Sequence, residues 1–362
     1  MSRARRPRLL LDLRMVEGRL HGIARYALAL AARIPEAAPE LELLGLGPPD
    51  GLPPLGPLAP AFPVLPCAAG FLSPLEQPAL AAALARARPD LFHATSFSVP
   101  RLWPGPLVAT LHDATHLVRR REYGLLTALY YRTVVRPRLR RARAVLTVST
   151  FAQRELAESL GLSEGSVQVV PDGVDAHFHP PSDAERARAR AELGLPERYL
   201  LAIGNDKPHK NLRWLAALAP RLPLPLVLLA GPDAAARLGL PAGVVSLEAV
   251  DEELLPALYG LADALLLPSL HEGFGLPALE AMASGCPVLG SRAGALPEVM
   301  GEAGVLLPPG DPEAWLGAIH RLTSGAGWRR ELITHGRARA ELFSWDACVR
   351  TTVEVYRRSL AA

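Results

Sequence analysis

The chain has 362 residues, of which 49% are hydrophobic and 21% charged, and its formal net charge is +3. This length predicts two domains with the composition of a globular protein. The charge is too small to indicate nucleic-acid binding, and no apolar run approaches the roughly 18 residues that a membrane span needs.

The three cysteines, Cys67, Cys286 and Cys348, lie far apart and lack metal-ligand spacing, which is typical of a reducing compartment. Near the basic N-terminus, Asp12 interrupts an apolar run that is too short for a signal peptide. We therefore expect a cytoplasmic protein without a metal site, and we leave open a peripheral contact with the inner face of a membrane.

Short apolar runs alternate with helical patterns along the first half of the chain, as in parallel sheets covered by helices. One helix is expected from about Gly22 to Ile34, and another after the N-cap Ser149, ending at Gly161. Strands are expected at residues 8–13, 41–46, 91–95, 107–113, 144–149 and 166–171.

A polar, proline-rich stretch between Phe178 and about Glu197 is the predicted linker. A second alternating series follows it, so the fold class is α/β with two doubly wound, Rossmann-like domains. Ligands of such sheets bind beyond the carboxyl ends of the strands. The strands of the second half are expected at residues 199–204, 224–231, 243–250, 262–269, 287–292 and 303–309.

The segment 268–288 combines two glutamates with a glycine-rich turn into a helix. Glu272 precedes the turn, and Glu280 lies in the helix that starts near Pro277. Glycines let a ligand approach the backbone, and the N–H groups of a helix start suit a phosphate. The alternative is that the acidic side chains only complement the helix dipole. Carboxylates that accept from vicinal hydroxyls would suit sugar and ribose rings.

This segment resembles the E-x7-E signature of family 4 of the retaining GT-B glycosyltransferases. Other segments resemble further parts of that family in the expected order, over nearly the whole chain. They are the phosphate loop at 204–212, the His-Asp segment at 111–117, the interdomain stretch at 147–175, the N-terminal glycine loop at 22–31 and the closing helix at 343–356.

The resemblance implies a GT-B fold with two domains facing a cleft. An acceptor-side domain would span residues 1–180 and a nucleotide-sugar domain residues 181–342, with a helix at 343–362 crossing back to the first domain.

The resemblance also implies roles for individual residues. Glu280 would bind the ribose diol and Glu272 the transferred sugar, while His112 would lie near the reacting sugar and Asp113 would be structural. The expected donor-binding positions are Gly22, Gly204, Asn205, Lys207, Lys210, Phe274, Gly275, Leu276 and Glu280.

Lys207 and Lys210 are the only two lysines of the chain, against 37 arginines. Lys210 matches the family lysine that neutralises the donor diphosphate. Asn205 stands where many members carry Arg, so Lys207 and His209 remain the candidates for a second cation. Ala24 stands where a second glycine is common in the N-terminal loop.

Nine arginines lie between Arg119 and Arg143, interleaved with tyrosines. One interpretation is a solvated face enriched in arginine by coding bias. The other is a basic surface that meets anionic phospholipid or a pyrophosphate-linked lipid acceptor. No recognition motif for nucleic acid accompanies the charge.

We therefore expect a retaining transferase that moves a hexose, with GDP-mannose as the leading donor, to a glycan or lipid-linked acceptor in cell-surface polysaccharide synthesis. No metal or other cofactor is expected. The alternatives are a nucleotide-sugar epimerase on the same fold and a non-catalytic partner subunit of another transferase.

Overall fold

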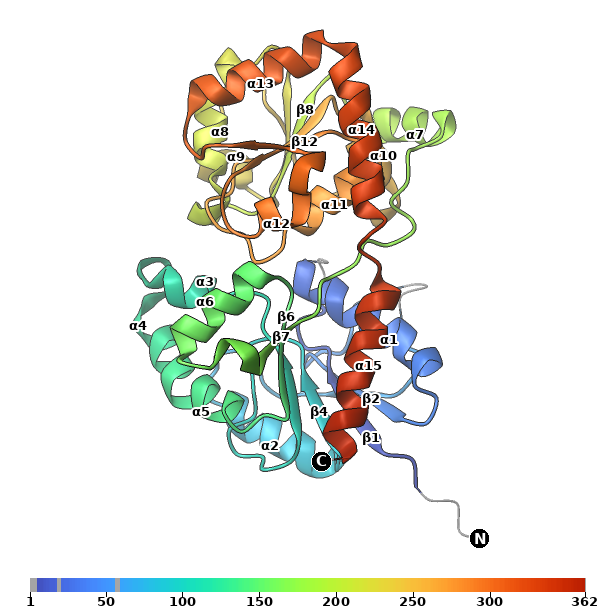
Figure 1. The fold of residues 1–362 in the computed structure, drawn as a ribbon, viewed down its shortest axis with the longest axis vertical. Coiled ribbons are helices and arrows are strands. Elements are labelled where there is room, and N and C mark those ends of the chain that lie inside the picture. The colour runs from blue at the N-terminus through green and yellow to red at the C-terminus, as the bar shows by residue number, and fades with distance from the viewer. Residues whose placement is uncertain (1–4, 18–20, 56–58, 362) are drawn as a thin grey trace. The chain divides into compact units, whose positions relative to one another are not determined.

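The protein is described here by a computed structural model that covers residues 5–17, 21–55 and 59–361 (Figure 1). These residues form two compact units. Unit 1 contains the chain up to Gly173 together with the residues from Trp345 onward, and unit 2 is Val174–Ser344. The chain thus leaves unit 1 a few residues before the division expected after residue 180.

The described part of unit 1 contains a parallel sheet in the order β3-β2-β1-β4-β5-β6-β7. All strands expected in this half are present, and β3 is an addition at the sheet edge, where a proline is tolerated. The strands are β1 (Arg8–Asp12), β2 (Glu42–Gly47), β3 (Val64–Pro66), β4 (Leu91–Ala94), β5 (Leu107–Thr110), β6 (Ala144–Thr147) and β7 (Val167–Val169).

Helices flank this sheet, and α15, which ends the chain, packs against α1 (Figure 1). The expected N-cap is confirmed, because Ser149 Oγ accepts from Ala152 N at 3.0 Å, and Gly161 ends that helix with φ 58°. The helices of unit 1 are α1 (Gly22–Ala37), α2 (Glu76–Ala87), α3 (Thr115–Val118), α4 (Arg120–Tyr130), a π-helical turn (Tyr131–Val135), α5 (Arg136–Leu139), α6 (Thr150–Leu160) and α15 (Trp345–Ala361).

The described part of unit 2 contains a second parallel sheet, in the order β10-β9-β8-β11-β12-β13. Each run expected in the second half contains one of these strands. They are β8 (Leu200–Ile203), β9 (Leu226–Leu229), β10 (Val245–Leu247), β11 (Ala264–Leu267), β12 (Val288–Ser291) and β13 (Val305–Leu307).

The segment expected to be a linker contains a helix instead, so that expectation was wrong. Ser182 and Glu185 cap this helix, α7, reciprocally, because Glu185 N donates to Ser182 Oγ and Ser182 N donates to Glu185 Oε2. The longer helices of unit 2 are α7 (Asp183–Leu193), α8 (Leu212–Leu218), α10 (Leu255–Leu261), α11 (Leu276–Ala283), α13 (Pro312–Ser324) and α14 (Ala326–Ala340), with the short α9 (Ala234–Leu238) and α12 (Leu296–Met300) between them.

Each unit has its own apolar core, built from aliphatic strands that are covered on both faces. Strands β4, β5, β11 and β12 are buried along their whole length. Cys67, Cys286 and Cys348 are buried and free. Among the described residues, no helix has the length and apolar character needed to cross a bilayer.

Candidate active site

The strand order of unit 2 reverses direction between β8 and β11, which lie next to each other in the sheet. The loops that leave neighbouring strands in opposite directions open a crevice at such a switch point. The loop after β8 carries residues 204–211, and the loop after β11 carries residues 268–275. These two loops hold every candidate of the second half except Leu276 and Glu280, which lie in α11 directly after them.

The loop after β8 is held by its own polar groups. Asn205 Oδ1 accepts from Lys207 N at 3.2 Å, which closes a short turn and leaves the Lys207 side chain exposed. A Cβ on Gly204 would come no closer than 3.4 Å to its neighbours, so packing inside the unit does not require glycine there. A requirement for glycine at this position would therefore come from a bound ligand.

Lys210 and Glu272 form an ion pair between the two loops. Lys210 Nζ donates to Glu272 Oε1 at 2.8 Å and to Oε2 at 2.9 Å, and the side chains are only 20% and 12% exposed. Ser269 Oγ donates to Glu272 Oε1 at 2.7 Å. The lysine and the glutamate assigned to two parts of one donor therefore face each other at contact distance.

Two further hydrogen bonds tie the loops together. Leu270 N donates to the carbonyl of His209 at 2.7 Å, and Asn211 Nδ2 donates to the carbonyl of Pro268 at 3.2 Å. Asn211 has φ 56°, a left-handed conformation that asparagine tolerates better than most residues. The buried His209 side chain and these bonds set the position of Lys210 relative to Glu272.

The turn from β11 into α11 buries the Phe274 side chain inside unit 2. The Phe274 ring is 6% exposed and packs edge-on against Phe343, with ring centroids 5.8 Å apart. Gly275 has φ 105°, and a Cβ there would lie 2.8 Å from Leu296 Cδ2, so glycine is required. Leu276 is the first residue of α11, whose first N–H groups have no partner within the helix.

Glu280 lies in α11 and is 5% exposed. The hydroxyl of Tyr259, in α10, donates to Glu280 Oε2 at 2.7 Å. This bond helps to set the rotamer of the buried carboxylate. Tyr259 had no motif to mark it, because its role depends on how α10 packs against α11.

His112 belongs to unit 1, where it follows β5. Its Nε2 lies 3.1 Å from the carbonyl of Thr95, which can only accept, so Nε2 carries the proton and Nδ1 is the acceptor. The Tyr26 ring packs edge-on against His112 at 4.9 Å. Burial lowers the pKa of His112 to about 4, so the imidazole is neutral at pH 7.

Two other residues named in the sequence analysis, Asp113 and Gly22, also belong to unit 1. Asp113 Oδ1 accepts from Thr115 N at 3.0 Å at the start of α3, in agreement with the structural role expected for it. Gly22 is the exposed first residue of α1, one turn before Tyr26.

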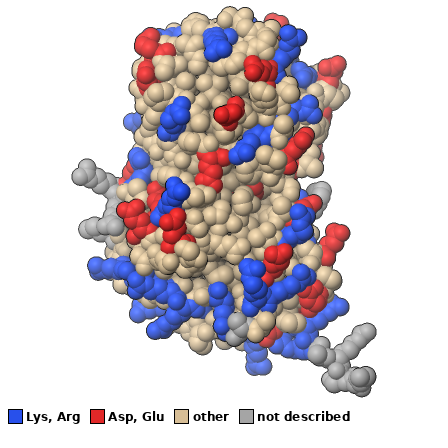
Figure 2. Space-filling model, viewed as in Figure 1, with Lys and Arg blue, Asp and Glu red and all other residues tan. Residues whose placement is uncertain are grey.

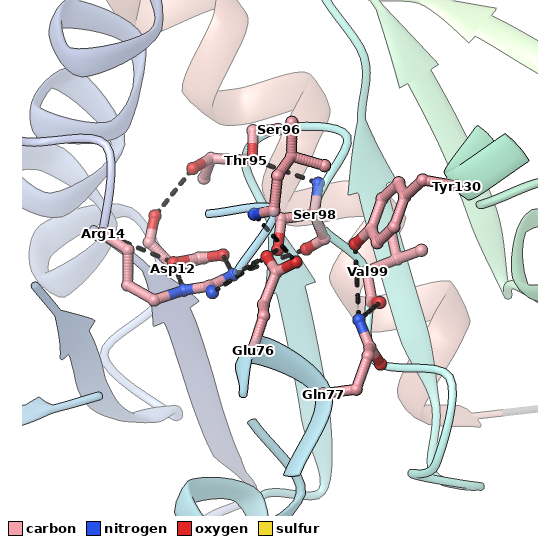
Figure 3. Close-up of polar contacts among 10 residues, drawn as sticks. Asp12, Arg14, Glu76, Gln77, Thr95, Ser96, Ser98, Val99 and Tyr130 are labelled. Carbon is pink, nitrogen blue, oxygen red and sulfur yellow. Dashed lines mark hydrogen bonds and ion pairs between the residues drawn. The ribbon is translucent and has the colours of Figure 1, made fainter. Parts of the chain in front are cut away.

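Unit 1 has its own switch point, between β1 and β4, and charged side chains fill it (Figure 3). Arg14 donates to both carboxylate oxygens of Asp12, at 2.9 and 2.7 Å, and its Nη1 lies 3.6 Å from Glu76 Oε1. Ser98 Oγ donates to Glu76. These side chains are almost completely buried, so this position is packed by an ion-paired cluster.

Sequence reasoning missed three residues that support the candidates of unit 2: Ser269, Tyr259 and Gly294. Gly294 has φ 60°, and a Cβ there would lie 2.5 Å from Glu272 N, so glycine lets this segment pass against the Glu272 backbone. The signals for all three are tertiary contacts. Within the described ranges, no group of three or more His, Cys, Asp and Glu side chains is arranged to hold a metal ion.

Comparisons with known proteins agree with this architecture. Residues 20–178 match the family described as "Glycosyltransferase Family 4", and residues 197–324 match "Glycosyl transferases group 1". An MMP alpha-(1->4)-mannosyltransferase of Mycolicibacterium hassiacum is 35% identical over 71% of this chain, which spans 66% of that relative's length. An O-antigen chain mannosyltransferase B of Escherichia coli is 30% identical, with 74% of each chain covered.

A solved structure shares the fold over almost the whole chain. HepE of Anabaena, in complex with UDP and glucose, has a TM-score of 0.76 with 19% identity, covering 98% of this chain and 100% of its own. Two doubly wound units of this kind are the architecture of the GT-B glycosyltransferases. The chain belongs to glycosyltransferase family 4, and the expected fold and enzyme class are confirmed.

Proposed function

We propose that this glycosyltransferase is a retaining hexosyltransferase that uses a nucleotide-diphosphate sugar. The observation that carries the proposal is the pairing of Lys210 Nζ with Glu272 Oε1 at 2.8 Å, at the switch point of unit 2. A diphosphate needs a cation, and the hydroxyls of a sugar need acceptors. Lys210 therefore suits the diphosphate and Glu272 the sugar, the two groups joined by the bond that breaks in the reaction.

The donor would replace the internal partners of this pair. Lys210 would turn its donors toward the diphosphate, and the N–H groups at the start of α11 would bind the same oxygens. Glu272 would accept from the sugar hydroxyls and Glu280 from the ribose diol. Because these groups supply the positive charge, we propose that no metal ion or other cofactor takes part.

The transfer step would replace one bond at the anomeric carbon by another on the same face. The bond to the diphosphate oxygen breaks, the acceptor oxygen bonds to the carbon, and the acceptor proton passes to an oxygen of the leaving phosphate. Lys210 would stabilise the charge that develops there, and one charge-assisted hydrogen bond contributes about 1.5–3 kcal/mol. The Nδ1 atom of His112 would accept from a sugar hydroxyl.

GDP-mannose is the leading donor, and a glycan or lipid-linked molecule of cell-surface polysaccharide synthesis is the leading acceptor. The names of the mannosyltransferase relatives support a mannosyl donor. The free, buried cysteines support a cytoplasmic setting, because thiols stay reduced there. We assign acceptor binding to unit 1, and we propose that unit 1 makes peripheral contact with a membrane near Arg119–Arg143.

Turnover of nucleotide sugars tests this proposal. The protein is incubated with GDP-mannose and other nucleotide sugars, with and without glycan and lipid-linked acceptors, and release of the nucleoside diphosphate is measured. We expect release of the nucleoside diphosphate to depend on the acceptor. Glu280→Ala should slow this release at least about tenfold, which corresponds to about 1.4 kcal/mol in the activation barrier. Conversion of the donor to an isomer without acceptor would instead identify an epimerase, and no turnover with any donor would favour a non-catalytic subunit.

A further inference from the structure

The charge of the protein is divided unequally between its units. Residues 1–173 and 345–362 contain 24 arginines against 16 Asp and Glu, whereas residues 174–344 contain 15 Lys and Arg against 20 Asp and Glu. The small net charge of the chain therefore hides a basic unit 1 and an acidic unit 2. Figure 2 shows Lys and Arg side chains gathered over the surface of unit 1 in this view.

Unit 1 also carries most of the exposed large apolar side chains among the described residues. Five leucines, which we call the leucine face, lie on three segments of unit 1. They are Leu72 (45% exposed), Leu75 (67%), Leu102 (63%), Leu126 (82%) and Leu129 (45%). Scattered exposed leucines need no explanation, but leucines gathered on one surface indicate an interaction site.

Hydrogen bonds that Glu76 accepts and Gln77 donates join these three segments, and Figure 3 shows those to Ser98, Val99 and Tyr130. Leu72 N and Ser98 Oγ both donate to the Glu76 carboxylate. Gln77 Nε2 donates to the Tyr130 hydroxyl at 3.3 Å and to the carbonyl of Val99 at 3.1 Å. The segments around residues 72–75, 98–102 and 126–130 are therefore neighbours in space, which brings the leucines that they carry to one part of unit 1.

The arginines that follow α3 do not all serve as a solvated basic face. Arg138 is buried and donates to the carbonyls of Pro100 and Gly105, so it supports the segment that carries Leu102. Arg119 pairs with Glu122 on α4. Arg101, next to Leu102, and Arg132, one turn after Leu129, are exposed and place positive charge at the rim of the leucine face.

We propose that the leucine face is a membrane-docking surface that binds bilayers containing anionic lipids. The leucines enter the boundary between headgroups and acyl chains, and the guanidinium groups at the rim bind lipid phosphates. The complementarity of a basic unit to an anionic bilayer selects this occupant over a second copy of the chain, whose own leucine face would carry the same charge. The inference extends the proposed peripheral contact, but it requires no turnover.

Sedimentation with vesicles tests the proposal on the full chain. Vesicles of phosphatidylcholine alone are compared with vesicles that also contain phosphatidylglycerol, at low and at high salt. The wild type should be retained by the anionic vesicles at low salt and released in part at high salt. Leu75→Ser with Leu126→Ser should weaken retention at least tenfold, which corresponds to about 1.4 kcal/mol. Arg101→Gln with Arg132→Gln should weaken it severalfold, mainly at low salt.

Matched controls come from unit 2. Leu342 is 70% exposed there, and Leu342→Ser should leave retention unchanged, as should Arg337→Gln at an exposed arginine. Circular dichroism shows whether each variant is folded. Wild-type protein that stays in the supernatant with anionic vesicles overturns the proposal. A second result would also overturn it: light scattering finds that the wild type is a dimer, and the double leucine variant is a monomer with unchanged vesicle retention.

Discussion

Removing the Lys210 ammonium should destabilise the protein and slow the reaction for two separable reasons. In Lys210→Met the Glu272 carboxylate, 12% exposed, loses two hydrogen bonds of 2.8 and 2.9 Å and keeps the Ser269 hydroxyl. A buried polar group that loses its partner costs about 1–3 kcal/mol. We therefore expect the free energy of unfolding to fall by about that amount.

The double variant Lys210→Met with Glu272→Gln should recover most of this stability, because no unpaired charge is left. Activity should not recover, since the diphosphate still lacks its cation. Each single variant should lower kcat/KM at least about tenfold, and the double variant should be no faster than the slower single one. Denaturant unfolding gives the stability, and release of the nucleoside diphosphate gives the rate.

Lys207 provides the control, because its side chain is exposed in the same loop. Lys207→Arg should hardly change donor affinity or rate, whereas Lys210→Arg should reduce one of them, because a planar guanidinium cannot replace a compact ammonium in a small site. A double variant that regains both stability and turnover would refute the reasoning and reduce the pair to a structural ion pair.

Three further predictions concern groups around the site. Tyr259→Phe removes the hydroxyl that holds Glu280 at 2.7 Å, and should raise the KM for the donor severalfold in steady-state assays while the fold persists. Gly275→Ala forces a Cβ to within 2.8 Å of Leu296 at φ 105°, and should lower the denaturation midpoint by the equivalent of about 1–3 kcal/mol. His112 is protonated less readily when folded, with a pKa of about 4, than when unfolded. Its contribution to stability is therefore complete above about pH 6.5 and is lost as the pH falls toward 4. In His112→Gln, the free energy of unfolding should fall less steeply over this pH range, which denaturant unfolding at several pH values would measure.

The strands and the two-domain division were predictable because their signals are local. Parallel strands covered on both faces read as continuous apolar runs, and every strand of the two sheets except β3 coincides with such a run. The edge strand Val64–Pro66 was missed because prolines at its ends obscure the pattern of a strand. Helix α7 was missed for the same reason, although its Ser182 and Glu185 form a capping box that the sequence displays.

The candidate site was only partly predictable. The family resemblance marked Lys210 and Glu272, but nothing in the sequence indicated that they bind each other, because the pairing depends on β8 and β11 being neighbours. Tyr259 lies outside every motif, and its hydroxyl reaches Glu280 only because α10 packs against α11. The leucine face joins segments that lie far apart in the chain, so an arginine run was the only trace of it in the sequence.

Donor binding measured by thermal unfolding tests the central claim most directly. A nucleotide sugar at about a hundred times its dissociation constant stabilises its binder by about 2.7 kcal/mol. A screen of nucleotide-diphosphate sugars should find one, GDP-mannose first, that raises the melting temperature of the wild type and has little effect on Lys210→Met. If no nucleotide sugar raises it, or if both proteins respond equally, the assignment of Lys210 and of the donor site is contradicted.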